Sequence, residues 1–264
     1  MYATNYHRAS SVADALRLKG ASDEAKYVSG GMTLIPTMKQ RLAAPSDLVD
    51  LRHIAEMKGI TVSGGRVRIG AGTTHAEVAQ SAEIKAACPA LAHLASLIGD
   101  PQVRHMGTIG GSIANNDPAA DYPSAMLALA ATIVTDRREI AADDFFTGLF
   151  ETALQDDEIV VAVTFAPPER AGYSKFPNPA SRYAMTGVFV AKGPGGVRVG
   201  VTGAGANGVF RHAAMEAALA GNFSAQALNG VTTDPSELLS DIHGSAEYRA
   251  NLVNVMARRA VAAA

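Results

Sequence analysis

The spacing of apolar positions over the first 55 residues predicts a small α/β unit. A helical face begins just after Ser11, at a position typical of a helix cap. β-rich runs at 26–29 and 48–51 predict two strands, and the stretch 34–42 between them predicts a helix. The glycine pair Gly30–Gly31 therefore falls where the first strand meets that helix.

The pattern restarts after position 55 and predicts a second, larger α/β unit. A hairpin is expected around 63–65, where Ser-Gly-Gly follows a β-rich run. A second glycine-rich run, TIGGSIANNDPAADYP at 108–123, leads into an alanine-rich helix. The other expected elements are a strand at 67–71, helices at 75–80, 90–98, 123–130 and 144–150, and strands at 132–135 and 159–165.

The last third of the chain has a different pattern. Residues 166–178 contain three prolines, which predicts a linker. Apolar runs at 184–191 and 197–203 flank Lys-Gly-Pro-Gly-Gly, which predicts an antiparallel hairpin, and helices follow. We therefore expect an α+β protein, with two small α/β subdomains at about 1–55 and 56–170 and a C-terminal domain of antiparallel sheet and helices at 171–264.

Composition adds mainly exclusions. The chain has 264 residues, 48% of them apolar, and a formal charge of −2 without blocks of like charge. This disfavours nucleic acid and a charged membrane surface as partners. The longest apolar runs are shorter than the roughly 18 residues of a membrane span, and the N-terminal residues do not have the pattern of a secretory signal. We expect a cytoplasmic protein without membrane insertion.

Cysteine and histidine usage limits the metal chemistry of this chain. Cys88 is the only cysteine, so the chain can form no internal disulfide and cannot supply the roughly four thiolates of an iron–sulfur cluster. Any such cluster would belong to another chain. The seven histidines show no spacing typical of a metal site, and we predict no metal ligands. Cys88 itself is expected to be a buried, inert thiol.

The two glycine motifs, residues 29–34 and 108–112, carry the candidate chemistry. A diphosphate needs several donors at close range, and backbone N–H groups approach it most easily where Cβ atoms are absent. Gly30 and Gly31 precede a helix in this way, although a plain turn is the alternative for one glycine pair. The sequence matches neither GxGxxG nor the P-loop pattern.

The second glycine motif strengthens the case for a long ligand. It is expected to be a loop, and polar residues at 112, 115, 116 and 121 accompany its two glycines. We expect free main-chain amides at 30–31 and 110–111 to converge on one dinucleotide, with one motif at the phosphates and the other at the remaining part of the ligand.

The motifs together carry a family resemblance over nearly the whole chain. SGGMTLIPTMKQRLAAPSDLVDL is followed by IGAGTTHAEV, DPQVRHMGTIGGSIANNDPAADYP and VTGAGANGVFRHAAMEAALAG. In this order they resemble the FAD-binding medium subunit of molybdenum-containing hydroxylases, the family of carbon monoxide dehydrogenase and xanthine dehydrogenase. The resemblance implies a PCMH-type FAD-binding fold for 1–170 and a carbon monoxide dehydrogenase flavoprotein C-terminal-like domain for 171–264.

The resemblance also implies which residues contact FAD. Residues 29–34 would hold the diphosphate, the second motif would touch the flavin nucleotide, and an acid, an apolar strand, a lysine and an aromatic residue would complete the site. The implied residues are Ser29, Gly30, Gly31, Met32, Thr33, Leu34, Thr108, Gly110, Gly111, Ser112, Asp121, Ile159, Val160, Lys175 and Tyr183. Neither motif contains histidine, so FAD is expected to be noncovalent.

Some of these residues depart from the family pattern or have other interpretations. Relatives often have a polar residue where this chain has Met32, and asparagine where it has Ser112. Asp121 could instead cap the helix that follows it. Lys175 could be a solvated linker residue, and Tyr183 could pack within a hairpin.

The function that the resemblance implies is electron transfer. Partner subunits, a small one with [2Fe–2S] clusters and a large one with a molybdopterin cofactor, would pass electrons to FAD and on to an external acceptor, in a dimer of heterotrimers. No catalytic residue is expected in this chain. The alternatives are a stand-alone FAD-dependent oxidase or dehydrogenase, and a non-enzymatic nucleotide-binding module. The sequence names neither the substrate of the complex nor the acceptor.

Overall fold

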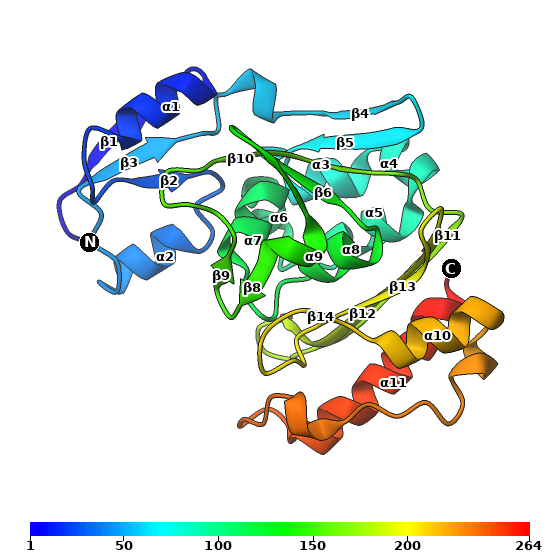
Figure 1. Cartoon of the computed structure of the whole chain (residues 1–264). Coiled ribbons are helices and arrows are strands. Elements are labelled where there is room, and N and C mark those ends of the chain that lie inside the picture. Colours follow the sequence, from blue (N-terminus) through cyan, green and yellow to red (C-terminus); the bar gives the residue numbers. More distant parts are fainter.

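The computed structural model describes residues 1–264 and places the first 50 residues around a small parallel sheet (Figure 1). Its strands have the order β1-β3-β2, and β3 pairs in parallel with both neighbours. Parallel neighbours need crossover connections, which the two helices supply. The elements are β1 (Asn5–Arg8), α1 (Val12–Lys19), β2 (Lys26–Val28), α2 (Leu34–Lys39) and β3 (Asp47–Asp50).

A five-stranded antiparallel sheet follows, with the order β4-β5-β10-β6-β7. The predicted hairpin at 63–65 is confirmed, and Gly64 and Gly65 both have the positive φ that its turn needs. The strands are β4 (Ile60–Ser63), β5 (Arg66–Gly70), β6 (Thr132–Thr135), β7 (Glu139–Ala141) and β10 (Val160–Phe165).

Short helices fill the space between this sheet and the C-terminal part (Figure 1). They are α3 (His75–Gln80), α4 (Ala82–Ala87), α5 (Pro89–Ser96), α6 (Pro101–Met106), α7 (Ile109–Asn115), α8 (Tyr122–Ala128) and α9 (Ala142–Phe145), with the 3₁₀ turn η1 (Ala55–Met57). A small hairpin, β8 (Phe146–Gly148) and β9 (Glu151–Thr152), follows α9. No helix is long and apolar enough to cross a membrane.

The C-terminal part is a four-stranded antiparallel sheet, β11-β12-β13-β14. Helices α5 and α8 contact it from the side of the five-stranded sheet, while α10 and α11 contact it from the C-terminal side (Figure 1). The elements are β11 (Arg170–Pro177), β12 (Ala184–Gly193), β13 (Gly196–Thr202), β14 (Phe210–Arg211), α10 (Ala213–Gly221), η2 (Ala225–Leu228), η3 (Pro235–Glu237) and α11 (Ala246–Ala262). The expected α+β class is therefore confirmed.

Three apolar cores support these sheets. The largest, of 37 buried residues, includes Tyr173, Phe189 and Ala191 of the four-stranded sheet, so the N-terminal and C-terminal parts share it. A second core of 15 residues lies beneath α10 and α11. The third consists only of Val28, Met38 and Leu48, and it supports α2 and the first glycine motif. The domain limits expected from the sequence remain a prediction.

Two expected elements outside the glycine motifs are wrong. Most of the expected linker, 166–178, is strand β11. Two of its prolines precede the strand and the third ends it, and β11 is an edge strand, where missing N–H donors are tolerated. The expected helix at 144–150 is also wrong, because α9 ends at Phe145 and β8 begins at Phe146.

Candidate cofactor site

The first glycine motif connects the end of β2 to the start of α2 (Figure 1). Gly31 has a φ of 71°, in the left-handed region that favours glycine. The six consecutive N–H groups of residues 29–34 donate to no backbone carbonyl of the chain. Thr33 precedes α2, and its side chain makes no bond to the helix end. The motif therefore presents a row of free donors, which suits an anionic ligand.

The second glycine motif differs from its expectation. It is not a loop, because residues 109–112 form the first turn of α7, with Thr108 as N-cap. Its amides are not free either. Those of Ile109 and Gly110 donate to the carbonyls of Thr73 and Ala71, and those of Gly111 and Ser112 donate to Thr108. The expectation of bare amides at 110–111 is therefore wrong, whereas the structure agrees with that expectation at 30–31.

The two motifs nevertheless meet. The hydroxyl oxygens of Ser29 and Thr108 are 3.1 Å apart and share a hydrogen bond. A Cβ at position 30 would lie 2.1 Å from the carbonyl oxygen of Met106, so glycine is needed there for close contact between the two segments. The second motif and the residue pair before it therefore contact the first motif directly, next to its free amides.

Asp121 and Lys175 form a buried ion pair between α8 and β11. The Lys175 Nζ lies 3.0 Å from an Asp121 carboxylate oxygen and 3.1 Å from the Leu97 carbonyl oxygen, and the Tyr173 hydroxyl donates to the other carboxylate oxygen. Burial raises the pKa of Asp121, while the Lys175 ammonium and the Tyr173 hydroxyl act against that rise.

This geometry overturns two alternative interpretations. Asp121 stands at the N-cap position of α8, but its carboxylate makes no cap bond to the helix. Lys175 is not a solvated linker residue, because only 3% of its side chain is exposed. The pair instead fixes the Lys175 ammonium next to a carboxylate within the protein, where burial keeps both groups from solvent screening.

The remaining expected residues lie in different environments. Ile159 and Val160 are buried at the start of β10. Tyr183 is half-exposed between β11 and β12 and lines a cavity of about 300 Å³. Burial, followed by the charges of Asp117 and Asp121, raises the pKa of Tyr183.

Met32 is 38% exposed, so its side chain is not part of the core. Ser112 is half-buried on the first turn of α7. Which of the expected residues touch a cofactor stays a prediction.

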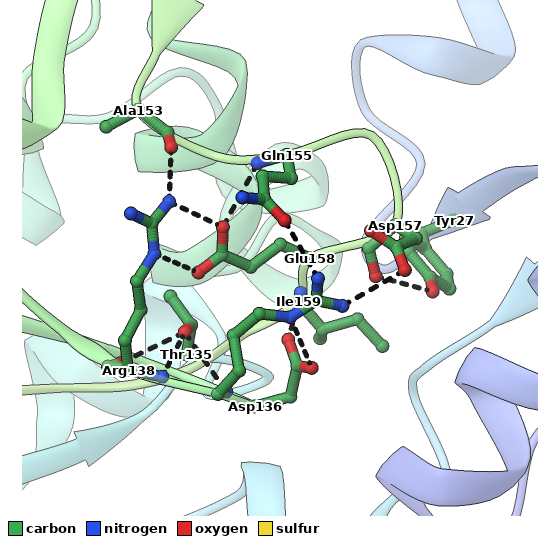
Figure 2. A network of polar contacts seen from close by, with 10 residues as sticks. Tyr27, Thr135, Asp136, Arg138, Ala153, Gln155, Asp157, Glu158 and Ile159 are labelled. Atoms are coloured by element: carbon green, nitrogen blue, oxygen red, sulfur yellow. Dashed lines mark hydrogen bonds and ion pairs between the residues drawn. The ribbon is translucent and has the colours of Figure 1, made fainter.

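A polar network that sequence reasoning missed lies beside this site (Figure 2). The Arg138 guanidinium donates to both carboxylate oxygens of Glu158 and to the Ala153 carbonyl. Arg137 pairs with Asp136 and Asp157, and donates to Gln155. The Arg138 guanidinium lowers the pKa of the Glu158 carboxyl to about 2. Together the two arginines fix the turn that precedes Ile159.

The sequence does contain a signal for this network. The pair Arg137-Arg138 follows a predicted strand after one intervening residue, and Gln155-Asp-Asp-Glu158 directly precedes the neighbouring strand. Since β6 and β10 pair antiparallel, these opposite charges lie at the same end of the sheet. Charge complementarity between strand ends could therefore have predicted the contact.

The metal-ligating and thiol side chains of the chain are not arranged for chemistry. No group of three or more His, Cys, Asp or Glu side chains is arranged to hold a metal ion. Cys88 is buried, as expected, and burial raises the pKa of its thiol to about 12. This thiol is therefore uncharged and inaccessible at neutral pH.

Comparison with known proteins shows which family the chain resembles. Residues 2–168 match the family described as FAD binding domain in molybdopterin dehydrogenase. The carbon monoxide dehydrogenase medium chain of Hydrogenophaga pseudoflava is 33% identical, over 98% of this chain and 96% of that protein. The nicotine 6-hydroxylase medium subunit of Paenarthrobacter nicotinovorans is 34% identical, with the same two coverages.

The fold agrees with these relatives. A structure of carbon monoxide dehydrogenase from Hydrogenophaga pseudoflava, which lacks the Mo-pyranopterin moiety of its molybdenum cofactor, matches with a TM-score of 0.87 and 35% identity. The match covers 99% of this chain and 96% of that one. The free donors at residues 29–34 are what a diphosphate requires, so the residues present fit an FAD cofactor.

Proposed function

Because this chain belongs to the FAD-binding medium subunits of molybdenum hydroxylases, an oxidoreductase family, we propose that residues 29–34 hold the diphosphate of its FAD. The single observation that carries this assignment is the row of six free amides. Backbone donors hold a ligand without side-chain entropy cost, and Gly31 has the left-handed conformation that is common in anion-binding turns. The Thr33 hydroxyl, which makes no cap bond, would add a further donor.

The second glycine motif would contact FAD differently. Its amides are already bonded, so Thr108, Gly110 and Gly111 would contribute shape, and Ser112 would contribute its hydroxyl. A Cβ at position 110 would lie 2.4 Å from the Ala71 Cβ, so this glycine allows α7 to pack closely against the residue that follows β5. Gly111 is exposed and would form part of the surface against the cofactor.

The remaining expected residues would surround the flavin end. FAD, when bound, accepts single electrons and passes on pairs. Lys175 would place a positive charge near the ring, and its pairing with Asp121 fixes the position of that charge. Ile159 and Val160 would form an apolar wall, and the exposed ring of Tyr183 would cover the flavin.

The subunit would receive its electrons from other chains. Its single cysteine cannot hold an iron–sulfur cluster, so the [2Fe–2S] clusters would belong to a small partner subunit and the molybdopterin cofactor to a large one. We further propose a dimer of these heterotrimers, in the cytoplasm. The electrons would leave FAD for an external acceptor.

Co-expression with candidate partner genes tests this function. We expect the chain to purify with a cluster-bearing chain and a molybdopterin-bearing chain, at one FAD per copy, and its flavin to be reduced when the complex receives substrate. An isolated chain that turns over an organic substrate without partners would contradict the electron-transfer role. A chain whose flavin no donor reduces would contradict it as well.

A further inference from the structure

The first glycine motif is anchored by few apolar contacts. A core of only three buried residues, Val28, Met38 and Leu48, supports it, with the partly buried Leu34, Ile35 and Ala43 packed against them. The opposite face of the same sheet joins the core of 37 residues. Segments with little buried apolar area open locally at low free energy. Polar contacts to the neighbouring lobe, residues 60–165, therefore matter for keeping the motif in place.

One such contact starts two residues before the motif. Tyr27, on β2, donates its hydroxyl to the Asp157 carbonyl oxygen at 3.1 Å, across 130 residues of sequence (Figure 2). Burial, followed by the charge of Asp136, raises the pKa of Tyr27, so the hydroxyl stays a donor over the physiological range. The bond joins the parallel sheet to the lobe of the five-stranded sheet.

The acceptor of this bond lies in a turn that several polar contacts hold. Arg137 bonds the Asp157 carboxylate at 3.1 Å and Gln155 at 3.0 Å, while Arg138 bonds Glu158 on the same turn. The next residue, Ile159, donates its amide to the Asp136 carboxylate at 2.7 Å. Polar contacts therefore hold the turn both before Ile159 and at Ile159 itself. An acceptor that is already held in place loses less entropy when it receives a hydrogen bond.

We propose that Tyr27 and Arg137 form a latch that holds the first glycine motif against the second lobe and so slows the release of FAD. This inference rests on the proposed assignment of the diphosphate to residues 29–34. Tyr27 acts through the motif and touches no reacting atom, so it is a positioning residue. Tyr27 lies two residues before Ser29, and Asp157 lies two residues before Ile159, so their hydrogen bond connects the segments that carry both proposed walls of the site.

The expected effect is modest and measurable. The loss of one neutral hydrogen bond changes an equilibrium or rate constant about two- to twelvefold. Tyr27→Phe keeps the ring and removes only the donor. We therefore expect FAD to leave the variant about two- to twelvefold faster than it leaves the wild-type chain.

A matched control exists in the same sheet. Tyr6 on β1 donates its hydroxyl to the Asp50 carboxylate of the same sheet, so Tyr6→Phe removes a charge-assisted bond, at least as strong as that of Tyr27, without affecting a contact between the lobes. The experiment dilutes each FAD-loaded full-length chain into a flavin scavenger and follows the rise of free-flavin fluorescence. Hydrogen exchange of the 26–38 segment in the FAD-free chains provides a second readout. Arg137→Met removes the support of the acceptor, and its double variant with Tyr27→Phe measures the coupling.

Faster FAD release and faster exchange in Tyr27→Phe, with Tyr6→Phe at wild-type values and a less-than-additive double variant, would support the latch. Wild-type release in Tyr27→Phe would overturn it, and so would equal acceleration in both tyrosine variants, which indicates general loss of stability. Failure of the underlying assignment is distinguishable, because a Gly31 variant would then bind FAD normally. If Gly31→Ala loses FAD affinity while Tyr27→Phe releases FAD normally, only the latch fails.

Discussion

Replacing Gly31 by alanine tests the free amides directly. The residue has a φ of 71°, where an alanine costs about 1–2 kcal/mol. The added Cβ would also lie 3.0 Å from the Ile35 side chain. Both strains are relieved by rotating the peptide planes that carry the amides of residues 31 and 32. We therefore expect the variant to fold, with at least one donor turned away from the diphosphate.

The loss can be estimated from one charge-assisted hydrogen bond. Such a bond contributes about 1.5–3 kcal/mol, and each 1.4 kcal/mol changes affinity about tenfold. FAD should therefore bind Gly31→Ala about ten- to 150-fold more weakly than it binds the wild-type chain. A fluorescence titration of the FAD-free chains measures this ratio, and the ratio of flavin to protein after purification gives a second estimate.

Gly65 supplies the control, since its φ is 72° and no atom would contact a Cβ there. Gly65→Ala introduces the same backbone strain in the β4–β5 hairpin, away from the motif. Both variants should lose similar thermal stability, about 2–4 °C per kcal/mol. Only Gly31→Ala should lose affinity. If FAD binds Gly31→Ala as tightly as Gly65→Ala, the amides of this motif do not hold the diphosphate.

Three further outcomes follow from the buried polar groups. Lys175→Met should shift the flavin reduction potential to more negative values. It should also destabilise the chain by about 3–5 kcal/mol, because Asp121 stays buried without its partner. Adding Asp121→Asn should restore the stability but not the potential. Glu158 has a pKa of about 2 in the folded chain, below its unfolded value, so it stabilises the fold above pH 4.5 and loses this effect as pH falls toward 2. Urea unfolding between pH 5 and 3 should therefore show a weaker acid dependence in Glu158→Gln than in the wild-type chain. Asn116→Gly keeps the left-handed end of α7 but removes two bonds to hairpin carbonyls, so its unfolding free energy should fall by about 1–3 kcal/mol.

The sequence predicted the first glycine motif well because its signals are local. A β-rich run, two glycines and a helix follow one another within a few residues, and the free amides result from that order. The second motif has similar glycines, but the amides of Ile109 and Gly110 meet acceptors from Thr73 and Ala71, far away along the chain, in addition to the local bonds to Thr108. Those acceptors come from tertiary structure, which composition and periodicity do not reveal.

Lys175 shows a different limit of sequence reasoning. The prolines around it predict a linker, and a lysine in a linker is expected to be solvated. Its burial depends on Asp121, 54 residues earlier, and on the position of β11 at the edge of a sheet. The arginine network could have been predicted from complementary charges, but only after the pairing of β6 with β10 was known. The resemblance identified both Lys175 and Asp121 without indicating that they form a pair.

The shared core has a consequence for dissecting this protein. Tyr173, Phe189 and Ala191 lie beyond the stretch that matches the FAD-binding family, yet they fill the same interior as α5 and α8. A fragment ending at residue 168 would expose that interior to water and would tend to aggregate. The C-terminal third thus completes the core of the part that matches the FAD-binding family. Exchanging it between relatives would require matching the residues on both sides of this shared core.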